Sequence, residues 1–224
     1  MAFDLPAPVH YRREDFFVSP ANALALASVD GWRNWPGGKL VLAGPSGAGK
    51  THLARLWAED SGAAIIDAAD LALDDLPAIA AAGAVAVENA DRIAGGRLAE
   101  VALFHLHNLL LPAGRLMVTA ATPPRDWGLV LPDLLSRMQA ALLVPIDSPD
   151  DALLSAVLVK LFADRQIAVP GNLISYMVTR MPRSIAAARD LVAVLDLRAL
   201  AEGRPVTRAL AASVLGAPME TEDA

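Results

Sequence analysis

The sequence predicts an α/β protein in which a five-stranded parallel sheet is covered by helices on both faces and followed by a small all-helical domain. Three observations predict this class. Short apolar segments alternate with helical segments as far as residue 147. A glycine-rich loop joins the first apolar segment to a helix. From residue 148 onward only helical patterns follow, and no strand pattern returns.

The predicted strands are short apolar runs, as expected where a parallel sheet is buried on both faces. They cover residues 39–43, 63–67, 84–87, 115–121 and 141–146. Ser19 as N-cap and Pro20 at the first helical position predict a helix before the first strand. A longer helix is predicted over "GRLAEVALFHLHNLLLPAG", where a proline and a glycine end it.

The same patterns divide the chain into four parts. Residues 1–18 form an irregular arm with two prolines and no apolar period, and residues 19–147 form the α/β core. Residues 148–216 form the helical domain, which Ser148 opens as an N-cap before a proline and two aspartates. Residues 217–224 are an acidic tail that we expect to be disordered.

Composition excludes several classes of protein. A net charge of −6 argues against a broad nucleic-acid footprint, so we expect contact with DNA only through a partner. Without cysteine there is neither a disulfide framework nor thiol catalysis. Mean hydropathy is +0.40, but no run approaches the roughly 18 apolar residues of a membrane span. Without a signal-peptide pattern, a soluble cytoplasmic protein is expected.

The strongest chemical signal is "GPSGAGKT", residues Gly44 to Thr51, which matches the phosphate-binding pattern G-x-x-x-x-G-K-[ST] in full. It leaves an apolar strand and enters a helix, as that pattern requires. Backbone N–H groups of such a loop point inward and hold an anion at the helix N-terminus. Lys50 supplies a charge for the outer phosphates, and Thr51 a hydroxyl for Mg²⁺. The sequence therefore predicts a bound nucleotide.

A second element of this site is expected where "AVAVENADR" ends its strand. Glu88 lies at the carboxyl edge of the predicted sheet, where ligands collect, and is the candidate metal carboxylate. Asn89 follows at the position expected for a water-activating acid. An amide cannot take a proton, so a general-base contribution of roughly 10²–10⁴-fold should be missing. Asp91 could replace it, but we expect its side chain to point elsewhere, and slow hydrolysis is predicted.

Taken together, these motifs resemble the AAA+ family, and within it the DnaA branch and its DnaA-related regulators of replication initiation. The matching segments are "FFVSPANALAL", "GPSGAGKTHLA", "VENADRIAG" and "TAATPPRDWGLVLPDLLSRM". The P-loop is specific only to a superfamily, whereas "TPPR" together with "LPDLLSRM" is much more specific. The resemblance spans about residues 16–215, and it implies an AAA+ αβα sandwich with a helical lid.

The resemblance also implies residue roles. Arg137 in "LLSRM" would be an arginine finger that acts in trans on a neighbour's nucleotide, where an arginine is worth about 10³–10⁵ in rate in other NTPases. A surface arginine in an ion pair is the structural alternative. Arg183 would be the sensor II arginine of the lid, with Arg180 and Arg189 as competitors. Thr119 or Thr122 would be sensor I, and Ala121 is less polar than is usual there, which favours a bound diphosphate.

The resemblance places an adenine pocket in the segment before the P-loop. The candidate nucleotide-binding residues are then Phe17, Val18, Asn22, Pro45, Ser46, Gly47, Ala48, Gly49, Lys50, Thr51, His52 and Arg183, and the candidate Mg²⁺ ligands are Thr51 and Glu88. His105 and His107 lie on different faces of one helix, so we expect no metal site there.

For partners, the resemblance implies the DnaA initiator and the DNA polymerase sliding clamp. The clamp peptide of such regulators contains a Gln that "MAFDLP" lacks. The motif is therefore degenerate, the chain starts earlier, or the segment is an ordinary frayed terminus. A helix-turn-helix domain, which the initiator carries after its lid, is not expected. A homodimer or higher oligomer stays open.

The leading hypothesis is a regulator that holds ADP or ATP and stimulates hydrolysis of DnaA-bound ATP through Arg137, with Glu88 and Asn89 at its own site. One alternative is a self-sufficient AAA+ ATPase such as a helicase loader. A P-loop small-molecule kinase is disfavoured because no substrate-lid insertion is evident. A degenerate paralogue that only tethers other molecules would tolerate the loss of Arg137.

Overall fold

The computed structural model describes residues 12–72, 75–111 and 113–216. Most of the N-terminal arm, Pro112 and the acidic tail therefore lie outside the described residues, as do the expectations that rest on them. The chain divides into two compact units. The core unit comprises residues 1–17, 25–43 and 50–145, and the helical unit comprises residues 18–24, 44–49 and 146–224.

The core unit is built on a five-stranded sheet of order β2-β3-β4-β1-β5, in which every pair of neighbours is parallel. The strands are β1 (Lys39–Ala43), β2 (Ala64–Asp67), β3 (Ala84–Glu88), β4 (Arg115–Ala120) and β5 (Leu142–Pro145). The three central strands are almost wholly buried. The predicted fold class, an α/β sandwich with a five-stranded parallel sheet and C-terminal helices, is confirmed.

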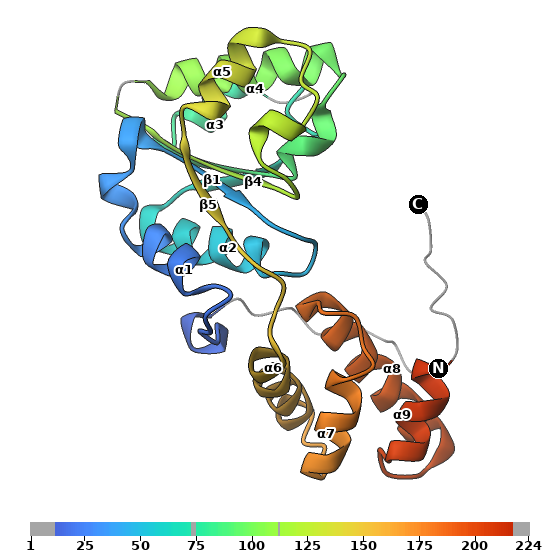
Figure 1. The fold of residues 1–224 in the computed structure, drawn as a ribbon. Coiled ribbons are helices and arrows are strands. Elements are labelled where there is room, and N and C mark those ends of the chain that lie inside the picture. The colour runs from blue at the N-terminus through green and yellow to red at the C-terminus, as the bar shows by residue number, and fades with distance from the viewer. Residues whose placement is uncertain (1–11, 73–74, 112, 217–224) are drawn as a thin grey trace. The chain divides into compact units, whose positions relative to one another are not determined.

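Helices cover the two faces of this sheet, as Figure 1 shows for the core unit. α3 (Leu76–Ala80), α4 (Arg97–Leu110) and α5 (Pro132–Gln139) lie on one face, and α1 (Ala23–Asp30) and α2 (Lys50–Ser61) lie on the other. One side of α4 buries Leu103, Leu106 and Leu110 against the sheet. Each buried leucine contributes about 1.5–3 kcal/mol to the free energy of folding, so this face of α4 stabilises the core unit.

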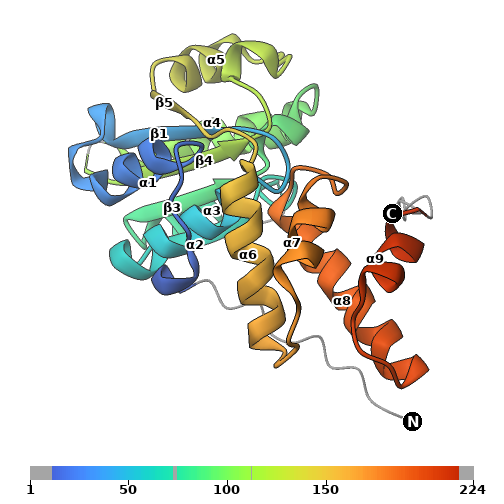
Figure 2. The same ribbon diagram turned by 60° about the horizontal axis from the view of Figure 1, so that its bottom comes forward.

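As far as residue 216, the helical unit contains four helices after β5: α6 (Asp151–Asp164), α7 (Gly171–Val178), α8 (Ile185–Glu202) and α9 (Arg208–Leu215). Figure 2 shows α6, α7 and α8 side by side, with α9 against α8. Capping fixes where three of them begin, since Asp150, Ser184 and Thr207 each accept a backbone N–H of the first turn.

One helix start differs from the sequence prediction. α6 is capped by Asp150 rather than Ser148, because the Asp150 carboxylate accepts the Leu153 N–H at 2.7 Å. A side-chain acceptor further along the chain thus competes successfully with the predicted serine cap. α1 begins at Ala23, after a turn in which Ser19 Oγ accepts the Ala21 N–H at 3.2 Å and Asn22 Oδ1 accepts the Ser19 N–H at 2.9 Å. The predicted Ser19 cap is therefore present, and Asn22 completes it as in a capping box. No helix in the described ranges combines the length and apolar character needed to span a bilayer.

Candidate functional site

The loop of the phosphate-binding motif leaves β1 after Ala43 and ends where α2 begins at Lys50. Gly47 and Gly49 have φ values of 73° and 107°, which only glycine adopts without strain. Ala48, between them, is 1% exposed. The two glycines therefore provide the turn that a phosphate-binding loop requires, and the helix that follows begins with the lysine and threonine of the motif.

Within the helical unit, this loop is bonded to the start of α8. The Ile185 N–H donates to the Gly47 carbonyl at 2.8 Å. A Cβ on Gly47 would collide with the side chain of Ser184. Position 47 thus needs glycine for its contact as well as for its φ value. Arg183, the candidate sensor II arginine, directly precedes these two contact residues.

Arg183 is held at the N-terminus of α6. Its guanidinium forms an ion pair with Asp151 at 2.7 Å and donates to the Pro149 carbonyl at 3.2 Å. Its competitor Arg180 stacks on the Tyr176 ring instead, with 4.1 Å between the guanidinium carbon and the ring centroid. Ser184, the residue after Arg183, lies against Gly47 of the phosphate-binding loop.

The segment proposed to line the adenine pocket begins in the core unit with Phe17 and continues in the helical unit with Val18 and Asn22. Val18 is 58% exposed, whereas Asn22 is buried at 2%. The segment is tied to the end of β5 by the Asp147 N–H, which donates to the Ala21 carbonyl at 3.0 Å. Val18 is thus open to solvent, whereas the Asn22 side chain holds the backbone turn before α1.

In the core unit, Lys50 and Thr51 open α2 and two carboxylates lie close to the lysine. Burial lowers the pKa of Lys50, while the charges of Asp91 and then Glu88 raise it. Asp91 exerts the larger effect of the two. Asp91 follows Asn89, whose left-handed conformation (φ 58°, ψ 38°) turns the chain after β3.

Asn89 is fixed by two bonds that the sequence did not reveal. Its side-chain Nδ2 donates to Asp67 Oδ2 at 2.6 Å, and its backbone N–H donates to Thr119 Oγ1 at 3.2 Å. Asp67 ends β2 in register with Glu88, which ends β3. A signal for Asp67 was present, because it ends a predicted parallel strand just as Glu88 does. Thr119, rather than Thr122, contacts this part of the site.

His52 is 7% exposed and faces the N-terminal segment. Its Nε2 lies 3.1 Å from the Arg12 carbonyl, and its ring makes an edge contact with Phe16 at 5.1 Å. His52 thus links α2 to residues 12–16.

The donor set fits a magnesium–nucleotide complex. The described residues contain no cluster of three or more His, Asp or Glu side chains that could hold a metal alone. Mg²⁺ bound to a nucleotide takes one or two protein ligands and completes its shell with phosphates and water. Thr51, at the start of α2, and Glu88, close enough to raise the pKa of Lys50, suit this role.

Arg137 lies on α5 at the opposite edge of the sheet, where strands begin. α5 ends at Gln139, and β5 then starts at Leu142, which pairs with Leu40 at the start of β1. Lys50 and Glu88 lie at the edge where strands end. Arg137 is exposed and makes no hydrogen bond or ion pair within the described part of the chain. The alternative of a surface ion pair is therefore not observed.

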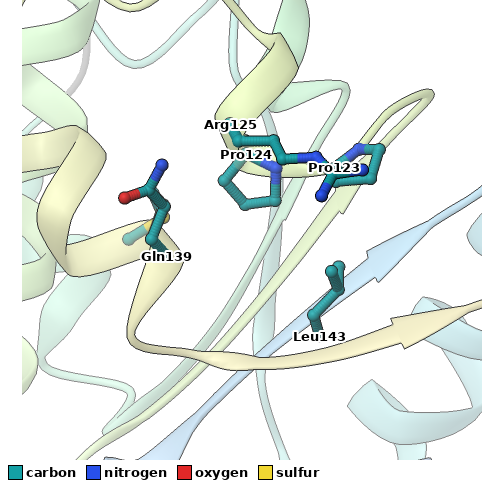
Figure 3. A pocket seen from close by; sticks show the side chains of 6 residues that line it. Pro123, Pro124, Arg125, Gln139 and Leu143 are labelled. Atoms are coloured by element: carbon teal, nitrogen blue, oxygen red, sulfur yellow. The ribbon is translucent and has the colours of Figure 1, made fainter.

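Between the two most specific motifs lies a cavity of about 270 Å³. Figure 3 shows Pro123 and Pro124 of "TPPR" on one side of it, with Gln139 of α5 and Leu143 of β5 opposite. Arg125 and Met138 complete its lining. The cavity joins the two motif segments beside α5, the helix that carries Arg137.

The comparisons with known proteins support the fold. Searched against protein-family models, the chain matches none. It is similar to domain III of the Thermotoga maritima replication initiation protein DnaA, with a TM-score of 0.78 and 19% identity over 94% of this chain and 98% of that one. AMPPCP-bound DnaA from Aquifex aeolicus gives a TM-score of 0.68 at 19% identity, covering 83% of this chain and 64% of that one. The FIGL-1 AAA domain gives 0.64 at 16% identity, over 91% of this chain and 80% of that one.

Proposed function

We propose that this chain binds ADP or ATP with Mg²⁺ and regulates DNA replication initiation in the manner of Hda, by stimulating hydrolysis of DnaA-bound ATP. The position of Arg137 carries this proposal. It is exposed, it has no ion-pair partner within the described residues, and it lies across the sheet from Lys50 and Glu88. An arginine so placed serves a nucleotide held by another subunit, where it stabilises charge on the transferring phosphoryl group.

The chain's own nucleotide would occupy the phosphate-binding loop. Backbone N–H groups of residues 44–49 and the Lys50 ammonium hold the phosphates, and Arg183 reaches them from the start of α8. Thr51 and Glu88 hold Mg²⁺, which neutralises phosphate charge when it is bound. The DnaA of Aquifex aeolicus, whose fold this chain shares, binds AMPPCP.

The chain's own hydrolysis would be weak. Asn89 occupies the position expected for the water-activating acid, and its amide is engaged by Asp67 at 2.6 Å. The proton that an attacking water must lose therefore has no acceptor at residue 89. A protein that retains its nucleotide and completes another protein's site agrees with this geometry.

DnaA is the proposed partner because the fold matches its domain III over nearly the whole chain. Such a pair would place two similar domains side by side, with Arg137 of one facing the nucleotide of the other. The sliding clamp would be bound through the N-terminal arm, whose Phe3, Asp4 and Leu5 lie outside the described residues. DNA would be reached only through these partners.

The test is ATP hydrolysis by the cognate DnaA, with clamp loaded on DNA, in the presence and absence of this protein. We expect stimulation by the wild type and a fall to the level of DnaA alone with Arg137→Ala. Arg97→Ala serves as the control, since Arg97 is an exposed arginine of the same unit, at the start of α4. Equal stimulation by the Arg137 variant would overturn the proposal, and so would a complete lack of stimulation by the wild type.

The second candidate, a self-sufficient AAA+ ATPase such as a helicase loader, is favoured by one observation. Asp91 acts on Lys50 more strongly than Glu88 does, so a second carboxylate lies near the phosphate end of the site. This candidate requires substantial turnover by the protein alone, with loss of that turnover in Lys50→Ala and Asp91→Asn. Turnover that survives both changes would belong to a contaminating enzyme.

A further inference from the structure

A second cation, Lys39, lies at the same sheet edge as Arg137. Lys39 is the first residue of β1, and its neighbour Leu40 pairs with Leu142, the first residue of β5. Only two residues separate Leu142 from the end of α5, the helix that carries Arg137. The strand register therefore brings the two basic residues to one edge, and the charge of Arg137 acts on both Lys39 and His107.

His107, on α4, holds the Lys39 side chain through a hydrogen bond. The Lys39 ammonium donates to His107 Nε2 across 3.0 Å, so this nitrogen must carry a free lone pair. The ring proton is then on Nδ1, which lies 3.2 Å from Asn108 Oδ1. His107 is 1% exposed, and burial lowers its pKa. A neutral histidine thus fixes the direction of a lysine that is partly exposed.

Neither cation of this pair has a countercharge. Several other arginines are matched with acids, as in Arg13 with Asp30 at 2.7 Å and Arg183 with Asp151 at 2.7 Å. Within the described ranges, neither Lys39 nor Arg137 forms an ion pair, although the chain carries a net charge of −6. Two like charges near one another raise the free energy of the unbound protein, and an anion placed between them removes that cost.

We propose that Lys39 acts together with Arg137 and that both contact the polyphosphate of the nucleotide held by the partner. This inference rests on the function proposed above. A triphosphate offers several anionic oxygens, so the arginine fork can take the transferring phosphoryl group while the lysine neutralises an adjacent one. His107 is a positioning residue, because it acts only through the Lys39 ammonium.

The experiment measures the maximal rate and the half-saturating concentration of this protein in stimulated DnaA ATP hydrolysis. Lys39→Met removes the charge and keeps the chain length, and we expect a maximal rate about 10- to 100-fold lower, the effect of one charged hydrogen bond. Lys39→Arg restores a charge and should recover most of that rate. Lys160→Met is the matched control, since it makes the same substitution on α6.

The outcomes separate this inference from the function on which it rests. If Arg137→Ala abolishes stimulation while Lys39→Met leaves the maximal rate unchanged, the role proposed for Lys39 is wrong. The proposed function, stimulation of DnaA ATP hydrolysis through Arg137, is then still supported. A Lys39→Met defect confined to the half-saturating concentration would also overturn the inference, because it indicates contact with the partner's surface rather than its phosphates. If Arg137→Ala has no effect, the proposed function itself fails.

A second measurement tests the contact between Lys39 and His107 without the partner. NMR titration of His107 should give a higher pKa in Lys39→Met than in the wild type, since one of the cations that lower it is gone. The Lys160→Met control should leave it unchanged. An unaltered His107 titration in Lys39→Met would show that the two side chains do not meet in solution, and it would remove the basis of the inference.

Discussion

Asn89 illustrates how one residue combines backbone and side-chain roles. It has a φ of 58° and donates to Asp67 Oδ2 at 2.6 Å. Asn89→Ala should lower the free energy of unfolding by about 2–4 kcal/mol, because it loses a hydrogen bond to a charged group and adopts αL at a cost. Asn89→Gly keeps the conformation and should lose less. Urea unfolding measures both, and equal losses in the two variants would contradict the backbone part of this account.

His107 predicts a pH dependence of stability. Burial lowers the pKa of His107, and the charges of Lys39 and Arg137 lower it further, against the opposing bond to Asn108. In the unfolded chain, His107 has an ordinary pKa of about 6.5. Just below that pH, His107 therefore binds a proton in the unfolded chain but stays neutral in the folded chain. Stability should be intact above that value and fall as pH drops below it, at up to about 1.4 kcal/mol per pH unit.

This dependence is measured by urea unfolding of the wild type and His107→Gln between pH 7.5 and pH 5, values chosen to bracket about 6.5. The wild type should lose more stability than the variant over this range. The difference between the two curves isolates His107 from the other histidines. Parallel curves would show that His107 is protonated as easily in the folded chain as in the unfolded one.

At the scale of elements, the placement of α5 depends on a carboxylate in α4. Glu100 is fully buried and accepts the backbone N–H groups of Gly95, Val130 and Leu131, the last at 2.8 Å. Glu100→Ala leaves these donors without an acceptor, and we expect a loss of about 3 kcal/mol or more in the free energy of unfolding. Stimulation of the partner should weaken as well, since α5 carries Arg137.

The Glu100 prediction is checked by urea unfolding and by the DnaA assay on the same preparation. Glu59→Ala, at an exposed position of α2, is the control and should change stability by less than about 0.5 kcal/mol. Glu100→Gln keeps one acceptor and should lie between the two. A Glu100→Ala protein as stable as the control would mean that the loop before α5 does not depend on this carboxylate.

The elements that the sequence predicted best are those with a local cause. Strands β1 to β5 agree with their predicted ranges to within one residue at each end, because each is a short apolar run between polar or glycine-rich turns. The start of α6 differs because several capping residues compete within three positions. The sequence pattern does not predict which of these residues becomes the N-cap, because the choice depends on the backbone path of the preceding chain.

The residues of the candidate site also differ in whether a local sequence pattern predicts them. The loop glycines, Lys50 and Glu88 follow from a contiguous motif and a strand end. The bonds of Asn89 to Asp67 and of Lys39 to His107 join residues 22 and 68 positions apart, and no local pattern encodes such pairs. The first pair forms where the ends of β2 and β3 meet in the parallel sheet, and the second forms where the start of β1 meets α4.

At the scale of the whole molecule, the prediction concerns the nucleotide. A ligand that binds the folded chain and not the unfolded one stabilises it by RT ln(1 + [L]/Kd), about 2.7 kcal/mol at 100 times Kd. ADP with Mg²⁺ should therefore raise the melting temperature, and Lys50→Ala should abolish most of this shift. Lys160→Met should keep the full shift, because Lys160 lies on α6 beside Asp164, outside the loop. Thermal unfolding with and without ADP decides the matter. A shift in melting temperature that persists in Lys50→Ala would place the nucleotide outside the phosphate-binding loop. If ADP causes no shift in the wild type, nucleotide binding is removed from the proposed function. The role of Arg137 in trans would then still be tested by the DnaA hydrolysis assay.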